Sequence, residues 1–485
     1  MRTLKSHNNP RPPLPSRLLR LTLIPLSLLL LVFLLSDQFP LYRSPAAFAQ
    51  LRQCGGGGTL GQWKRFLLYA PHSGFGNQVS EFKNAILMAG ILNRTLIVPP
   101  VMDHGAVALG SCPKFRVLGA GELRLKAWEH AVELLRDGRY ISLTSILDIS
   151  SLASEIQTIE FRDFVSLWCG VDLSHVCSTD SNTKSSALDT LLQCGSQLSG
   201  LNGTVNDCLY TVDEDCRSTV WTYGHKSEED GSLDSFQPDE QLRAKKKISF
   251  IRRRLDVYKR LGPGSKAHSA TLVAFGSLFT AKYKGSELLI DIHESRVDHR
   301  IQLLIERIGF IPFIPVITEA GKKYSSKIMS PFLCAQLRLL DGQFKNHWKT
   351  TFSYLREKVE SLKEGVRTRP IHIFIMTDLP PSNWSGTYLW ELARDVNSFK
   401  LHLMSEDINF VMTTTKKVAS FAFDMRLKTA VAEHNYYCSN GQLPDILLYL
   451  EETVCACSSL GFVGTAGSTI AESIEQMRRN AVCAR

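Results

Sequence analysis

Four polar segments of the chain each follow a short apolar run, and their residue types suit the binding of a phosphorylated ligand. The first is GFGNQ at residues 74–78, after the run 65–70. Glycine allows a backbone to approach a ligand closely. The start of the helix predicted beyond it would present N–H groups and a positive dipole to an anion. Taken alone, a glycine turn of this kind is more often structural than ligand-binding.

The second segment is QLRLLD at residues 336–341, at the end of the apolar run FLCAQL. Arg338 lies where this predicted strand ends. A guanidinium in that position can form two parallel hydrogen bonds with a phosphate group. The alternative is a buried ion pair between Arg338 and Asp341.

The third segment is Thr377-Asp378, directly after the apolar run 371–376. The carboxylate of Asp378 could accept two hydrogen bonds from the edge of a guanine base. On local grounds it could equally cap a helix beyond Pro380-Pro381.

The fourth segment is FVGTAGST at residues 462–469, before a predicted helix. Small residues and hydroxyl groups at a helix start form a cradle for phosphate. The alternative is that Ser468 is an ordinary helix N-cap, although Ser468-x-x-Ala471 is not a capping box. Together the four segments describe a site for an anionic nucleotide sugar.

The elements that must position these segments alternate between strand and helix. The pattern predicts strands at 65–70, 95–98, 331–339, 371–376, 401–404 and 462–463, and helices at 79–92, 344–362, 388–396, 445–455 and 468–478. Such alternation is typical of parallel sheets in an α/β fold. We expect two Rossmann-like domains, residues 63–325 and 326–480, facing each other across a cleft. Ligands bind such sheets at the carboxyl ends of the strands, where all four segments fall.

Four further features bear on the domains and on the site. Residues 169–243 are rich in Ser, Asp, Gly and Cys, and we expect them to form an insert in the first domain. The basic stretch 243–260 has apolar residues at helical spacing, which favours a solvated helix face over an anion site. Within the insert, Asp213-Glu214-Asp215 resembles a metal-binding DxD triplet, but solvated acids explain it better. Glu81, one helical turn after Asn77, is a candidate base or a surface residue near the helix start.

The N-terminus carries a membrane signal. The net charge of the chain is +9, but five basic and no acidic residues fall within the first 20 residues, which weakens any nucleic-acid interpretation. Residues 18–36 form an apolar run close to the ~20 residues that span a bilayer. Basic residues before it predict a cytosolic tail at 1–17, a signal anchor at 18–36, a stem at 37–62 and a luminal remainder. The short span favours an early secretory membrane, and we expect a Golgi type II protein. The alternative is a cleaved signal peptide ending near residues 47–49.

Twelve cysteines agree with an oxidising compartment, and five of them lie between Cys169 and Cys216. An even count predicts disulfides. Zinc is the alternative, but the chain has no CxxC pair, and Cys455 and Cys457 form only a CxC. Three Asn-x-Ser/Thr triplets permit glycosylation, at Asn93, Asn202 and Asn383.

The four segments also resemble a known family. Residues 74–100 (GFGNQVSEFKNAILMAGILNRTLIVPP) resemble the N-terminal signature of GDP-fucose protein O-fucosyltransferases, GxFGNQ followed by a helix and LNRTLxxPP. QLRLLD looks like the HxRxxxD segment of that family, and FIMTD and FVGTAGST look like its two remaining motifs. The resemblance covers most of residues 63–480 except 169–243, and residues 93–117 look like the plant members.

This resemblance implies a GT-B fold, GDP-fucose as donor, inversion at the anomeric carbon and no metal or other cofactor. It implies that Arg338 holds the β-phosphate of the departing GDP and that Asn77 lies near the sugar and the acceptor. It places Asp378 on guanine and Ser468 and Thr469 on phosphate. The remaining positions of the motifs are candidate donor-binding residues: Gly74, Phe75, Gly76, Gln336 and Asp341.

The expected function is therefore transfer of fucose to a hydroxyl of a protein or a glycan. The sequence departs from the family motifs at Gln336, where the family has histidine, at Gly74, where it often has arginine, and at Asp341, which comes one residue early. These departures leave two alternatives open. One is a transferase that uses another nucleotide sugar on a cell-wall polysaccharide, and the other is a luminal glycan-binding pseudoenzyme.

Overall fold

The chain divides into two compact units, Met1–Gln50 and Leu51–Arg485. The computed structural model describes residues 65–103, 118–201, 208–212, 219–220, 250–251, 257, 260–278, 299–340, 344, 348–365, 369–427 and 446–484. The predicted tail, anchor and stem (1–62), most of the basic stretch 243–260 and the acidic triplet 213–215 lie outside these residues. Among the helices that the structure describes, none combines the length and apolarity needed to cross a membrane.

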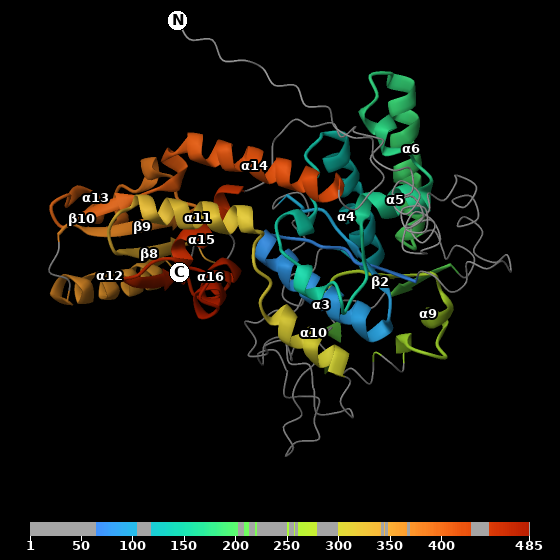
Figure 1. The fold of residues 1–485 in the computed structure, drawn as a ribbon, viewed down its shortest axis with the longest axis horizontal. Helices are drawn as coiled ribbons and strands as arrows, with labels where there is room; N and C mark the ends of the chain where they lie inside the picture. Colours follow the sequence, from blue (N-terminus) through green and yellow to red (C-terminus); the bar gives the residue numbers. More distant parts are fainter. Residues whose placement is uncertain are drawn as a thin grey trace, which may run out of the picture. The chain divides into compact units, whose positions relative to one another are not determined.

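The first sheet, which contains the strand labelled β2 in Figure 1, has five parallel strands in the order β3-β2-β1-β7-β4. Their bounds are β1 (Phe66–Leu68), β2 (Thr95–Val98), β3 (Thr158–Glu160), β4 (Leu209–Val212) and β7 (Leu272–Phe275). Every residue of β1, β2 and β7 is buried, as expected for parallel strands that are covered on both faces. A separate pair joins β5 (Thr219–Val220) to β6 (Phe250–Ile251).

Helices cover both faces of this sheet. The helices of this region are α3 (Phe75–Leu92), α4 (Ala120–Arg136), α5 (Phe161–Cys169), α6 (Ser181–Leu198), α9 (Lys266–Ser269) and α10 (His299–Gly309). Leu67 belongs to the core cluster that contains the α3 side chains, whereas its neighbours Phe66 and Leu68 belong to the cluster under α4, α5 and α6. This alternation follows from the period of two in a strand.

The stretch 169–243 is not simply an insert, which corrects our expectation. It contains α6, whose side chains pack in the core under the sheet. It also supplies β4, which pairs in parallel with β7 from Leu209 to Val212. This part of the cysteine-rich region is therefore integral to the first sheet.

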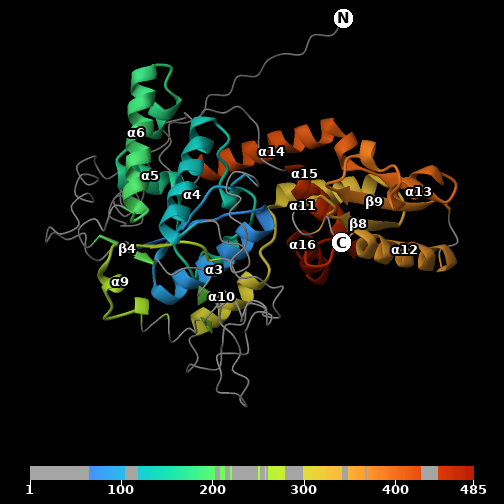
Figure 2. The ribbon, with the colours of Figure 1, turned by 180° about the vertical axis from the view of Figure 1, so that it is seen from behind.

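The second sheet has four parallel strands in the order β10-β9-β8-β11. Its strands are β8 (Phe332–Leu337), β9 (Ile371–Thr377), β10 (Phe399–His402) and β11 (Gly461–Gly464). Figure 2 shows α12 (Trp348–Gly365) and α13 (Tyr388–Arg394) near this sheet. Their side chains belong to the core cluster on one face of the sheet. The other face packs in a core with α11 (Pro315–Lys327), α14 (Ile408–Leu427), α15 (Ile446–Ala456) and α16 (Thr469–Arg479). Short 3-10 turns occupy Leu143–Ser145, Ser150–Leu152, Leu173–Cys177, Pro381–Asn383 and Met404–Glu406.

Most predicted strands and helices are confirmed to within a few residues, and the two parallel sheets confirm the predicted α/β class. Two differences stand out. The prediction lacked many elements, namely β3, β4, β5, β6, β7, α4, α5, α6, α9, α10, α11 and α14. In addition, α11 falls before the predicted boundary at residue 325 but packs against α14 and α15 of the second sheet. The largest core cluster also contains side chains from both sheets, such as Leu67 and Phe374.

The predicted disulfides are confirmed. Cys169 bonds to Cys194, Cys334 to Cys455 and Cys457 to Cys483. Cys177 and Cys208 are disulfide-bonded as well. Because Cys455 and Cys457 belong to two different disulfides, the CxC pair does not hold zinc through its thiolates.

Candidate functional site

The first turns of α3 and α16, which pack on different sheets, lie in close contact. A Cβ atom built on Gly76, in the first turn of α3, would lie 2.5 Å from Oγ1 and 2.8 Å from Cβ of Thr469, the first residue of α16. Only glycine allows this approach without a shift of one helix. The N-terminal ends of α3 and α16, each with unpaired N–H groups and a positive dipole, therefore converge.

The side chain of Ser468 does not cap α16. Ser468 is the N-cap residue, but its side chain makes no capping hydrogen bond. Its hydroxyl oxygen is buried, the residue is only 3% exposed, and the oxygen has no hydrogen-bond partner among the described residues. The alternative that Ser468 is an ordinary N-cap is therefore wrong. A buried hydroxyl without a partner is costly unless a ligand or water satisfies it.

Arg338 follows β8 and is half-buried. Its backbone N–H donates to Oγ1 of Thr465, at 2.9 Å, in the loop that leads to Ser468. Its guanidinium carbon lies 5.3 Å from the centroid of the Phe344 ring. The predicted partner Asp341 lies outside the described residues. The structure thus ties the Arg338 backbone to the same loop that begins α16.

Gln336 is buried in this arrangement, with 3% exposure. Its side-chain oxygen accepts from the Thr465 N–H at 3.2 Å, and its backbone oxygen accepts from the Thr465 hydroxyl at the same distance. The structure therefore places Gln336 as a support for the loop before Ser468, beneath the position where a ligand would contact the helix end.

Asp378 also supports the loop that carries Arg338. Its carboxylate accepts from the backbone N–H groups of Leu339, at 2.7 Å, and Leu340, at 3.1 Å. The 3-10 turn that follows Asp378 has Pro380 as its N-cap residue. The alternative that Asp378 caps a helix is therefore wrong. The assignment of Asp378 to guanine stays a prediction.

The GFGNQ segment contains half-buried residues and core residues. Gly74 is the N-cap of α3, and Asn77 is half-buried in its first turn. Phe75 is buried and packs against Tyr449, with ring centroids 4.4 Å apart, and Phe313. Its side chain belongs to the core, which corrects its assignment to the donor site.

Sequence analysis missed the role of Gln78. Its amide donates to the backbone oxygens of Ser73 and Met102, at 2.8 and 2.9 Å, and accepts from the Met102 N–H at 2.9 Å. This buried side chain holds the turn after β1 to the segment after β2. It therefore fixes the direction in which α3 begins.

Glu81 does not reach a ligand surface. It is fully buried, and it accepts from the His72 N–H at 2.9 Å and the Ser277 hydroxyl at 3.0 Å. Burial raises the pKa of Glu81 well above its ordinary value, and burial lowers the pKa of His72 to about 4. Both expectations for Glu81, a base in contact with the acceptor or a residue on the helix surface, are wrong. His72 and Ser277 were not predicted as site residues, although each lies shortly after the end of a strand.

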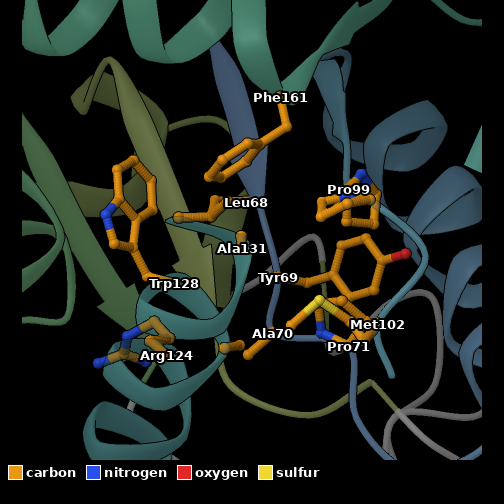
Figure 3. Close-up of a pocket in the computed structure, with 12 residues that line it drawn as sticks. Leu68, Tyr69, Ala70, Pro71, Pro99, Met102, Arg124, Trp128, Ala131 and Phe161 are labelled. Atoms are coloured by element: carbon orange, nitrogen blue, oxygen red, sulfur yellow. The ribbon is translucent and has the colours of Figure 1, made fainter. Parts of the chain in front are cut away.

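A small pocket lies at the ends of β1 and β2 beneath α4, and it contains none of the predicted site residues (Figure 3). Its empty space is about 350 Å³, part of it open solvent, and its lining is mainly apolar, including Trp128, Pro99 and Phe161. The charged side chain in its wall, Arg124, donates to the backbone oxygens of Ser199 and Val212. Such a lining does not suit a diphosphate.

Two of the three predicted glycosylation positions are described, and both are exposed. Asn93 ends α3 in a left-handed conformation, with φ of 50°, and Asn383 lies in a short turn after β9. Asn202 lies outside the described residues. Exposure permits modification at both described positions, which stays a prediction.

The fold and the site define an α/β protein of two parallel sheets in which two helix ends and one arginine loop are tied together at the strand ends. No family model matches the chain. It is 53% identical over 457 residues to "O-fucosyltransferase 30" of Arabidopsis thaliana, an alignment that covers 92% of this chain and 87% of the relative. The chain therefore belongs to the O-fucosyltransferase family, as its motifs predicted.

The solved structures that match the chain do so with low TM-scores and low sequence identity. A crystal structure of POFUT1 with GDP-fucose matches with a TM-score of 0.37 and 12% identity, over 86% of this chain and 94% of that one. A crystal structure of the fucosyltransferase NodZ from Bradyrhizobium matches with a TM-score of 0.32 and 9% identity, over 85% of this chain and 92% of that one.

Proposed function

We propose that this chain transfers fucose from GDP-fucose to a hydroxyl group of a protein or glycan, with inversion and without a metal ion. The observation that carries the proposal is the close contact of the α3 and α16 ends at Gly76, beside the Ser468 hydroxyl, for which the described part of the chain provides no hydrogen-bond partner. Identity of 53% to a protein named as an O-fucosyltransferase supports the sugar and the reaction class.

The reaction needs charge stabilisation more than any other help. As the glycosidic bond breaks, negative charge develops on the departing diphosphate and positive charge on the sugar ring. Arg338 and the two helix ends would supply fixed positive charge to the diphosphate, and such stabilisation costs no reorganisation at the moment of reaction. Asn77, half-buried in the first turn of α3, would lie near the sugar and the acceptor.

The sequence signals support the proposal that this chemistry takes place in the Golgi lumen, with residues 18–36 as a type II membrane anchor. Three disulfides between described cysteines support an oxidising compartment. Protease protection of intact microsomes tests the topology. The catalytic part should be protected until detergent is added, and digestion of that part without detergent would contradict the proposal.

A turnover assay tests the activity. Purified protein is incubated with GDP-fucose, and released GDP is measured with and without an acceptor extract and with and without EDTA. We expect GDP release that EDTA does not change. Equal or faster turnover of a UDP-sugar would assign another donor, and no turnover or binding of any nucleotide sugar would favour a pseudoenzyme.

A further inference from the structure

An unbroken chain of polar groups runs from the turn before α3 into the core of the first sheet. The Ser73 Oγ atom lies 2.9 Å from His72 Nδ1. On the other side of the ring, His72 Nε2 lies 2.8 Å from Ser277 Oγ and 3.1 Å from Glu81 Oε1. The Ser277 hydroxyl donates to the same Glu81 oxygen at 3.0 Å. This series of polar groups begins at half-buried Ser73 and ends at fully buried Glu81.

The donors and acceptors among these four side chains allow a proton to move inward, from Ser73 to Glu81. An ionised carboxylate only accepts hydrogen bonds, so Ser277 is the donor to Glu81. The Ser277 oxygen can then accept from the Nε2–H of His72. In that tautomer Nδ1 carries the lone pair, and it accepts from the hydroxyl of Ser73. Each group can therefore receive a proton from its outer neighbour while it passes one inward.

The electrostatics of the site also favour inward movement. Burial lowers the pKa of His72 to about 4, so the imidazole is neutral and acts best by gaining and losing a proton in one step. Burial raises the pKa of Glu81, so its carboxylate binds a proton more readily than a solvated one does. The titratable groups that face Glu81 are His72 and Tyr69, and burial and the Glu81 charge raise the pKa of Tyr69. The N–H groups of His72 and Leu278 hold the ionised form in place before the proton arrives.

Ser73 lies in a strained part of the turn before α3. It has φ of 64°, a left-handed conformation that few residues other than glycine adopt. Gln78 holds the Ser73 backbone oxygen in that conformation. Strain of this kind persists where surrounding structure enforces it, and it is concentrated at functional sites. Ser73 directly precedes the turn at Gly74–Gly76 that meets the first residue of α16.

We propose that Ser73 takes the proton of the acceptor hydroxyl during transfer, with His72, Ser277 and Glu81 as the relay that receives it. This inference rests on the proposed fucosyl transfer. The acceptor oxygen forms a bond to the anomeric carbon, and the bond from that carbon to the phosphate oxygen breaks, its electron pair leaving on GDP. The acceptor proton passes to Ser73 Oγ, the Ser73 proton to His72 Nδ1, the Nε2 proton to Ser277, and the Ser277 proton to Glu81. The proton returns by the same path to solvent after product leaves.

The test compares two substitutions that both remove the hydroxyl but differ in backbone strain, Ser73→Ala and Ser73→Gly. Both should lower kcat for fucosyl transfer by about 100-fold or more, the usual size of general-base catalysis. Both should keep the KM for GDP-fucose within about twofold and keep the rise in Tm that GDP causes. A merely structural role would instead make glycine, which suits this φ, behave like the wild type.

Glu81→Gln gives a second readout, because the wild-type rate should fall at low pH as Glu81 is protonated. The variant should lose this acid limb and transfer slowly at every pH. Glu452→Gln is the matched control, since Glu452 is also buried and bonded to a serine, Ser473, at 2.6 Å. It should keep the acid limb.

The outcomes separate the relay from the transfer reaction. If the wild type transfers fucose and both Ser73 variants remain within about threefold of its kcat, the relay is wrong and the proposed function stands. An acid limb that survives in Glu81→Gln overturns the relay as well. If the wild type neither binds GDP nor transfers fucose, the proposed function fails, and the relay fails with it.

Discussion

After β1 the first sheet buries a carboxylate, whereas after β8 the second sheet leaves an arginine half-exposed. Glu81 is enclosed by His72 and Ser277, and its charge is stabilised by N–H groups inside the core. Arg338 stands on a loop whose backbone is held from both sides, by Thr465 and by the Asp378 carboxylate.

The difference separates two chemical tasks. A buried carboxylate with a raised pKa is suited to receive a proton. A guanidinium whose loop is bonded to the segment before α16 is suited to hold a diphosphate. In this molecule the polar residues around Arg338, namely Gln336 and Asp378, support the loop through backbone contacts. We infer that acid–base chemistry belongs to the first sheet, whereas anion binding depends mainly on Arg338 and α16 of the second sheet, together with the start of α3.

The largest expected effect comes from Arg338→Ala, which removes the guanidinium group from the loop after β8. Transfer should fall by about 100- to 1,000-fold, the cost of losing one preorganised group that stabilises developing charge. Arg356→Ala is a matched control, because Arg356 is an exposed arginine of α12 that pairs with Glu391. Initial rates with GDP-fucose measure the effect. Equal losses in both variants would break the assignment of anion binding to the Arg338 loop.

A smaller effect is expected from Gly76→Ala, which tests whether the two sheets must meet closely. The new Cβ would lie 2.5 Å from Thr469 Oγ1, and overpacking of this kind costs about 1–3 kcal/mol. Displacing one helix end by about 1 Å can also lower the rate by about 100-fold. Thermal unfolding and initial rates together measure both losses.

Two controls make the Gly76 test specific. Adding Thr469→Gly to Gly76→Ala removes the side chain that clashes, so it should restore part of the stability. Gly309→Ala, at the end of α10, has no atom within 4 Å of the new Cβ among the described residues and should be nearly neutral. A Gly76→Ala protein as stable and active as the wild type would show that the helix ends need not approach.

The smallest expected effect on the rate comes from Glu452, whose contribution is to the pH dependence of stability. Burial raises its pKa from the ordinary 4.5 to about 8. Between these values the folded chain holds a proton that the unfolded chain has lost, so stability should fall as pH rises from about 4.5 to about 8. The slope from one such group is at most about 1.4 kcal/mol per pH unit. Glu452→Gln should flatten this slope in a series of Tm measurements, and an unchanged slope would remove Glu452 as its source.

Much of the fold was predictable because its strands are apolar and its helices are amphipathic. Residues 332–337 and 371–377 are buried runs, and α12 carries a clear stripe that includes Leu355 and Val359. The strand β4 was missed because four residues in a polar region become a strand only by pairing with β7. That pairing is a long-range contact which local composition does not reveal.

The motifs of the candidate site could be predicted from the sequence, but the hydrogen-bond network around Glu81 could not. Arg338 and Ser468 were identified from their places after apolar runs. The burial of Glu81 was not, because α3 is buried on nearly every side and therefore lacks the periodicity that separates inside from outside. His72 and Ser277 lie 205 residues apart, so no spacing in the sequence brings them together.

Calorimetric titration of GDP into the wild type and into Arg338→Ala tests the central claim most directly, namely that this arginine and the two helix ends hold the diphosphate. We expect GDP to bind the wild type more tightly than UDP, and the variant to bind GDP at least about tenfold more weakly with an unchanged Tm, a loss of about 1.4 kcal/mol or more. Equal GDP affinity in the two proteins would contradict the account.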